Sequence, residues 1–150
     1  MNFTRDEFEF SETAERRKIR NAVPPELEAN MRDTLAMMQR IRDHLRAMAG
    51  RDVPIIISSG YRCSVVNTLV GGSPASDHTR AEACDFRAPA FGSPFEVATE
   101  LAKHADALGL GQVAHEFGRW VHVSTRHPLK SANRIITISH AGTVPGIVRA

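Results

Sequence analysis

The most constraining feature of this sequence is a run of apolar residues at helical spacing within its first third. Apolar side chains recur every three or four positions, which predicts one long amphipathic helix. Pro25 suits the first turn of this helix and Gly50 its C-terminal stop. Such a face must be buried, and in a compact domain we expect it to pack against the domain's own sheet. The stripe consists of Leu27, Met31, Leu35, Met38, Ile41, Leu45 and Met48.

After Pro54 the pattern changes from helical to strand-like. The combination predicts the α+β class, with N-terminal helices packed on a small, mainly antiparallel sheet. Shorter helices are expected near residue 4, over residues 11–20 and over residues 93–109, where a capping box starts the last one. Strands are expected over residues 55–57 (buried), 83–86, 111–117, 119–125 and 134–139, the third and fourth as a hairpin.

Length and composition fit a single globular domain. With 150 residues, 42% of them apolar, the chain can bury a core without a disulfide or a structural metal. We expect one domain over residues 1–150, with a helical N-terminal part (1–52), a catalytic core (53–139) and a loosely held tail (140–150). Cys63 and Cys84 do not make a disulfide framework, so both are expected as free thiols.

The charge of the chain is balanced, with 19 Lys and Arg against 17 Asp and Glu. No long block of one sign is present, so we expect neither a nucleic acid nor a membrane as partner, and we expect a monomer. The first residues lack the basic and apolar regions of a signal peptide, and no apolar run is long enough to span a bilayer. These features predict synthesis in the cytoplasm.

Two histidines and one aspartate form a candidate metal site. His78, Asp85 and His122 offer two imidazoles and one carboxylate, the three-ligand set of a catalytic zinc site with a fourth position open. Strand alternation turns His122 away from Val121 and Val123, so that the valines fill the core while the histidine faces a cleft. A His and an Asp seven residues apart also arise by chance, so the pair alone leaves a metal-free alternative open. The remaining histidines, His44, His104, His127 and His140, are expected on the surface or on helix faces.

Hydrolysis at such a site needs a general base, and two candidates precede the last expected ligand. A three-residue hairpin loop over 118–120 would place Glu116 opposite His122. A two-residue loop over 118–119 would place His115 there instead. His115 also fits a packing role at the edge of the core. The residues alone leave this register open.

Several short motifs carry a family resemblance. They are residues 59–62 (SGYR), 66–67 (VN), 70–72 (VGG), 76–78 (SDH), 83–85 (ACD) and 120–122 (WVH). In order and spacing they resemble the M15 peptidases, which are zinc D-Ala-D-Ala carboxypeptidases and phage-encoded relatives, over about residues 3–139. The resemblance implies the Hedgehog/DD-peptidase fold, peptidoglycan stem peptides as substrate, and one zinc ion held by His78, Asp85 and His122.

The resemblance also implies roles around the zinc. Arg62 would lie beside the scissile carbonyl, where positive charge stabilises developing negative charge. The small phage-type members are similar in having Glu ahead of Trp-Val-His, which favours Glu116 over His115 as the base. Residues expected to contact the substrate or support the ligands are Ser76, Tyr61, Trp120 and His115.

Two positions depart from the family pattern. Vancomycin-resistance dipeptidases of the wider family carry the basic Glu three residues before the last His, where this chain has Arg119, so another residue must be the base. Members usually carry glycine in His-x-x-Gly-x-Ala-x-Asp, where this chain has Ala81. If this position takes a positive φ, alanine costs on the order of 1 kcal/mol and reshapes the loop. The ligand residues themselves are retained.

Two functions from different classes fit these observations. In the first, the protein is a peptidoglycan peptidase, either a D-Ala-D-Ala carboxypeptidase or an endopeptidase such as a phage endolysin that reaches the wall after release by a phage holin. In the second, it is a non-catalytic, zinc-stabilised module that binds the wall or has a structural role. A general base at Glu116 would be dispensable in the second case, so its presence favours the enzyme.

Overall fold

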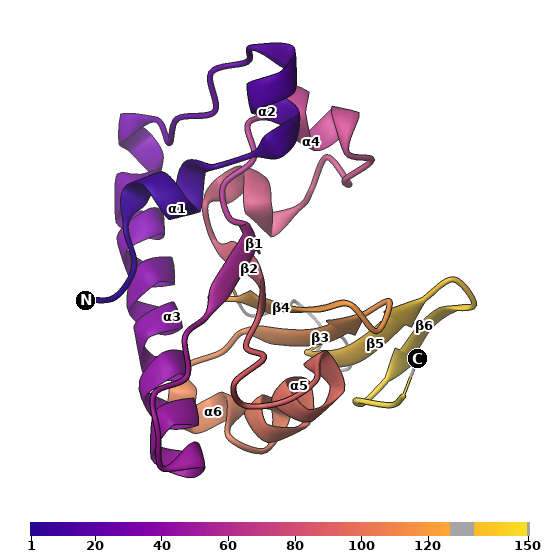
Figure 1. Ribbon diagram of the computed structural model, residues 1–150. Coiled ribbons are helices and arrows are strands. Elements are labelled where there is room, and N and C mark those ends of the chain that lie inside the picture. Colours follow the sequence, from indigo (N-terminus) through magenta and orange to yellow (C-terminus); the bar gives the residue numbers. More distant parts are fainter. Residues whose placement is uncertain (127–133, 150) are drawn as a thin grey trace.

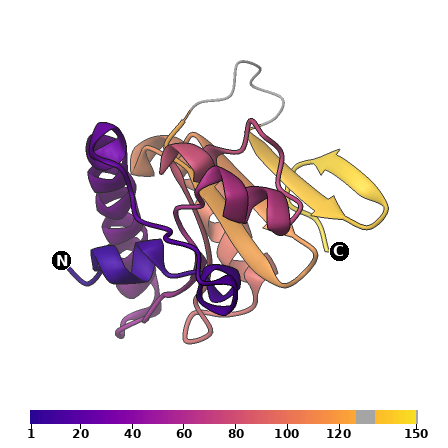
Figure 2. The same cartoon turned by 90° about the horizontal axis from the view of Figure 1, so that it is seen from above.

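The computed structural model describes residues 1–126 and 134–149, and His127 lies outside this part (Figure 1). A long helix stands beside a sheet, with one group of short helices at each end of the sheet region (Figure 1). Seen from above, the long helix lies on one side and the last two strands extend on the other (Figure 2). The α+β class expected from the sequence is confirmed.

The predicted helices begin where the sequence indicates, but two of them end or break earlier. The helix expected over residues 93–109 is broken at His104 into two, and the one expected to reach residue 20 ends at Arg17. The capping box at Ser93 and Glu96 is present. The helices are α1 (Arg5–Glu9), α2 (Glu12–Arg17), the 3₁₀ turn η1 (Pro25–Leu27), α3 (Glu28–Ala49), α4 (Ser64–Leu69), the 3₁₀ turn η2 (Asp77–Arg80), α5 (Pro94–Lys103) and α6 (Ala105–Leu108).

Helix α3 buries the predicted stripe except at its end. Five consecutive members of the stripe, from Met31 to Leu45, are buried in the core, where Met37 joins them. Met48 is 55% exposed, so the buried face ends one turn before the helix does. Gly50 closes α3 in the left-handed conformation expected of a C-terminal glycine.

The sheet has six strands in the order β1-β2-β4-β3-β5-β6. All neighbours are antiparallel except β3 and β5, which are parallel. The strands are β1 (Ile56–Ser59), β2 (Ala83–Arg87), β3 (Gln112–Glu116), β4 (Trp120–Ser124), β5 (Ile135–Ser139) and β6 (Gly142–Pro145).

Two strands differ from the sequence-based expectation. Strand β1 was expected to be buried, but it lies at the edge of the sheet and pairs only with β2, which leaves Ile56 47% exposed. Residues 140–150 were expected as a loosely held tail, yet Gly142–Pro145 form β6, hydrogen-bonded along β5. Two of the four residues of β6 are glycine and proline, which are uncommon in strands, so the sequence gives little signal for this strand.

The β3–β4 hairpin turns through residues 117–119, a register that neither alternative from the sequence contained. Phe117 and Gly118 both have positive φ, of 55° and 67°, and the Arg119 N–H donates to the Glu116 carbonyl over 3.0 Å. These are the features of a type I′ turn, which suits the twist of a hairpin. Arg119 is the third residue of this loop, and it has no partner opposite it because Glu116 pairs with Trp120.

A single buried hydrophobic cluster joins α3, the sheet and α5. Cys84 belongs to this cluster, and burial raises the pKa of its thiol, while Cys63 is half-buried. Both are free, as the sequence predicted. Within the described residues, no helix is long and apolar enough to cross a membrane.

The C-cap of α2 gives a test of the backbone conformation. Lys18 is exposed and adopts the left-handed conformation, at φ 54°, which strains any residue with a Cβ. Lys18→Gly should therefore raise the free energy of unfolding by up to about 1 kcal/mol, measured by urea denaturation. Arg17→Gly, the exposed neighbour inside the helix, should lower it by about the same amount. Equal losses for both variants would contradict the left-handed cap.

Candidate active site

The short 3₁₀ turn η2 positions His78. The Ser76 hydroxyl accepts the His78 N–H at the start of the turn, and Ala81 ends it in the left-handed conformation, at φ 58°. Ala81 stands where the family usually has glycine, and its positive φ costs an alanine about 1 kcal/mol. His78 Nδ1 lies 2.7 Å from the Gly60 carbonyl oxygen, which can only accept. Nδ1 therefore donates to this carbonyl, and Nε2 is the ring nitrogen that faces the site.

Strand pairing brings Asp85 and His122 directly opposite each other on β2 and β4. The neighbours of Asp85, Cys84 and Phe86, are buried in the core, as alternation predicts. Asp85 Oδ1 lies 2.8 Å from His122 Nδ1 and 3.2 Å from His78 Nε2. One ligand atom from each of the three residues lies within 4.8 Å of the other two.

The three side chains tune one another electrostatically. Burial favours a neutral carboxyl at Asp85, but the charge of His78 and the hydrogen bond from His122 outweigh it, so the pKa of Asp85 is far below its ordinary value. Burial also acts to lower the pKa of His122, and the hydrogen bond and charge of Asp85 raise it above the ordinary value. The carboxylate is thus held ionised between two imidazoles, which is an arrangement that favours a cation.

Glu116 faces the same site. It pairs with Trp120 across the hairpin, so its side chain shares the sheet face of His122. Its Oε1 lies 3.8 Å from His122 Nδ1, and its Oε2 accepts from the Trp120 indole over 3.0 Å. Burial raises the pKa of Glu116, with the charge of His122 opposing it. A carboxylate with a raised pKa beside the ligand cluster is suited to proton transfer.

His115 lies on the opposite face of β3. Its Nδ1 lies 2.9 Å from the Val148 carbonyl oxygen and its ring packs against Phe95. The structure does not bring it to the site, because the observed register pairs it with Val121 rather than with His122. His115 therefore has the packing role that the sequence left open as the alternative to acting as the base.

Arg62 reaches the site from the loop before α4. Its Nη1 donates to Asn67 Oδ1 over 3.3 Å, and its buried Nε has no hydrogen-bond partner among the described residues. Burial lowers the pKa of Arg62, with the charges of Asp85 and Glu116 opposing it. A Cβ at Gly72 would collide with the Asn67 amide, so this glycine permits the loop to close over the arginine.

These groups open onto one cavity of about 890 Å³. Its lining combines apolar residues, two of them from α4 and its C-cap, with the charged groups of the candidate site, which we call its floor. Ser76 and Trp120 line it, whereas Tyr61 is buried in the core and does not. The residues at its floor are Arg62, His78, Asp85, Glu116 and His122.

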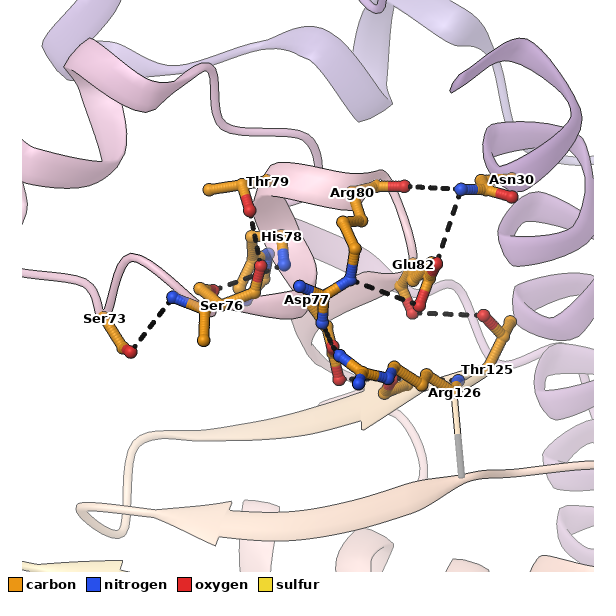
Figure 3. Close-up of polar contacts among 12 residues, drawn as sticks. Asn30, Ser73, Ser76, Asp77, His78, Thr79, Arg80, Glu82, Thr125 and Arg126 are labelled. Carbon is orange, nitrogen blue, oxygen red and sulfur yellow. Dashed lines mark hydrogen bonds and ion pairs between the residues drawn. The ribbon is translucent and has the colours of Figure 1, made fainter. Parts of the chain in front are cut away.

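A polar network around Asp77, which no sequence motif indicates, joins η2 to the sheet. Asp77 makes ion pairs with Arg80 and with Arg126, the latter at 3.5 Å (Figure 3). Its other oxygen accepts from the Ser124 hydroxyl over 2.8 Å. Ser124 is fully buried at the end of β4, two residues from His122. Asp77 therefore ties the turn of one ligand to the strand of another.

The opposite side of η2 is held by α3. Asn30 donates to the Arg80 carbonyl over 3.0 Å (Figure 3), and Thr34 donates to the Ala81 carbonyl over 2.8 Å. These hydrogen bonds satisfy the Arg80 and Ala81 carbonyl groups, which have no N–H partner in a following helical turn. No sequence motif signals them, because each partner lies about 50 residues away.

The donor set fits a zinc ion. Two imidazoles and one carboxylate converge, and the carbonyl contact of His78 is the kind that orients a metal-binding histidine. All three residues line the cavity, so an ion that they held would be accessible to a small molecule.

Comparison with known proteins gives a family. The model of a protein family described as Peptidase M15 matches residues 1–124, which covers more than two thirds of the chain and all the residues at the cavity floor. No curated protein matches the chain.

The Asp77 network predicts a loss of stability on its removal. Asp77→Ala leaves the buried Ser124 hydroxyl without its acceptor, which costs about 1–3 kcal/mol in the free energy of unfolding, measured in urea. Asp106→Ala is the matched control, because Asp106 is 90% exposed in its ion pair with Arg134 and should change stability by less than about 0.5 kcal/mol. Equal effects from the two variants would remove the network's structural role.

Proposed function

Because the chain belongs to the M15 peptidase family, we propose that it is a zinc-dependent peptidase that cleaves a peptide bond in the stem peptide of peptidoglycan. One observation carries the proposal. His78, Asp85 and His122 converge in the cavity that also holds the Glu116 carboxylate and the Arg62 guanidinium. Ligands, base and cation are the groups that peptide hydrolysis needs in one place.

The residues divide the reaction between them. When bound, zinc supplies a Lewis acid that makes water more acidic and polarises a carbonyl. Glu116 accepts a proton from the attacking water and gives it to the leaving amine as the C–N bond breaks. Burial raises the pKa of Glu116, which makes its carboxylate a stronger base toward the water proton. Arg62 faces the carbonyl oxygen as it becomes negative, or holds a substrate carboxylate by two hydrogen bonds.

The cavity supports a short peptide as substrate. Its charged groups suit the scissile bond and a carboxylate, and the apolar residues in its lining, among them Phe10, Val66 and Val70, suit small apolar side chains such as alanine methyl groups. Both D-Ala-D-Ala carboxypeptidase and endopeptidase action fit these features. Action on the wall as a phage endolysin is the finer form of the proposal, supported by the resemblance to phage-type members.

The alternative function is a non-catalytic, zinc-stabilised module that binds the wall. Such a module would need the three ligands and an open groove, but no carboxylate at 3.8 Å from a ligand histidine. Burial of Glu116 without a fixed cation is costly, and a binding module has no use for it. This position favours the enzyme.

The test of the proposal is digestion of purified peptidoglycan, with the soluble products identified by mass spectrometry. The wild-type protein should release peptides or D-alanine, and a chelator should abolish the release. Glu116→Gln keeps the shape of the side chain and should keep the zinc, but turnover should fall by about 10²–10⁴ because the base is lost.

His115→Gln is the matched control for this variant, since His115 is the neighbouring residue on the other face of β3. It should retain turnover within a few-fold. Digestion by Glu116→Gln at the wild-type rate would disprove the assignment of the base. A wild-type protein that binds peptidoglycan but releases nothing would favour the binding module.

The second prediction of this site concerns Arg62. Arg62→Ala should leave the zinc content unchanged and lower turnover by about 10² or more, because a cation at the developing oxyanion is removed. Arg32→Ala, an exposed arginine on α3, is the control. Near-normal turnover in Arg62→Ala would show that the guanidinium has no part in the reaction.

A further inference from the structure

A second cluster of histidine and carboxylate groups lies outside the cavity. We propose that His44, Glu100 and His104 form a second binding site for a first-row divalent cation. His44 belongs to α3, Glu100 to α5, and His104 to the break between α5 and α6. The sequence placed both histidines on surfaces or helix faces, because neither has a ligand-like neighbour at close spacing.

The geometry of this cluster is that of a ligand set. His44 Nε2 lies 2.8 Å and His104 Nδ1 lies 3.0 Å from the same carboxylate oxygen, Glu100 Oε2. The two imidazole rings are 4.5 Å apart. One ligand atom of each residue lies within 4.8 Å of the other two. A shift of the side chains by about an ångström would open room for an ion at normal bond lengths of about 2 Å.

The cluster repeats the chemistry of the candidate active site. In each case one carboxylate oxygen is approached by the Nε2 of one histidine and the Nδ1 of another, at 2.8–3.2 Å. Over residues 1–126 and 134–149, these are the two groups of three side chains whose ligand atoms meet this spacing. If convergence of this kind marks a metal site at His78, it marks one at His44 as well.

The charge of Glu100 favours a cation between the histidines. Its side chain is 11% exposed, and among the described residues its ion pairs are with His44 and His104 alone. A divalent cation between the two imidazoles would compensate the charge of this nearly buried carboxylate, and each imidazole would offer it a nitrogen lone pair. The present contact of His104 Nδ1 with the Glu100 carbonyl, at 3.2 Å, would be exchanged for the metal.

The ligand types and the position define which ion binds and what it does. Two imidazoles and one carboxylate suit zinc, nickel, copper or cobalt better than magnesium or calcium. His104 is 40% exposed, which gives an ion and its remaining waters access from solvent. None of the three residues lines the cavity that holds Glu116 and Arg62. The site is therefore structural, and it fastens α3 to the break between α5 and α6.

Zinc binding to the metal-free protein, measured by equilibrium dialysis over a range of free zinc, tests this proposal. The wild-type protein should bind two equivalents. His104→Gln and Glu100→Gln should each bind one tightly, with the affinity of the second weakened at least about tenfold. His140→Gln, an exposed histidine at the β5–β6 turn, is the control for adventitious binding and should keep both equivalents.

The two sites are separated by using His78→Ala as the background. In that variant zinc should still bind one equivalent and raise the midpoint of thermal unfolding, and adding His104→Gln should abolish both effects. Binding of a single equivalent by the wild-type protein, lost in His78→Ala, would overturn the second site and leave the proposed function intact. Two equivalents retained in both His104→Gln and Glu100→Gln would also overturn it. Failure of the proposed function would instead appear as an unchanged zinc content in His78→Ala.

Discussion

The pairing of β2 with β4 is the interaction on which the candidate active site depends. It sets Asp85 and His122 opposite each other with their side chains on one face, while Cys84, Phe86 and Val121 fill the core on the other. A shift of one residue would exchange these faces and place a carboxylate in the hydrophobic core. Burial of the apolar residues therefore fixes the register, and the register aligns the two strand ligands.

The third ligand cannot be supplied by the sheet, and the chain provides it through a strained turn. Three hydrogen-bonding partners hold this turn in place: the Gly60 carbonyl on His78 itself, α3 on the carbonyls of the turn, and Ser124 through Asp77. Ala81 can keep its left-handed conformation because this surrounding structure determines it. The long helix thus has two roles, since the same element that buries the methionine stripe also orients a ligand.

Sequence reasoning reached the class of fold, the long helix, most strands and the convergence of His78, Asp85 and His122, because these depend on local periodicity and on ligand chemistry. It missed β6, which begins with glycine and ends with proline and carries no strand pattern, and the end of the buried face at Met48. It also missed the hairpin register, because the positive φ at Phe117 is rare in a non-glycine residue and has no sequence signal. Glu116 lies on the same sheet face as His122, as expected, but through a loop over residues 117–119. The contacts of Asp77, and the meeting of His44 with Glu100, depend on tertiary structure alone.

The two histidine–carboxylate clusters differ in their surroundings rather than in their ligands. At His78 the cluster opens onto a cavity, a second carboxylate stands 3.8 Å from a ligand nitrogen, and an arginine with an unpaired buried Nε faces the same space. At His44 the same three ligand types come from α3 and from the C-terminal end of α5, and none of the three residues lines that cavity. A ligand set alone therefore defines only the affinity for an ion. Hydrolysis of a peptide requires the additional groups Glu116 and Arg62. The hairpin turn places Glu116, and the loop that Gly72 closes places Arg62. These two groups distinguish a site able to hydrolyse a peptide from one that only binds a metal.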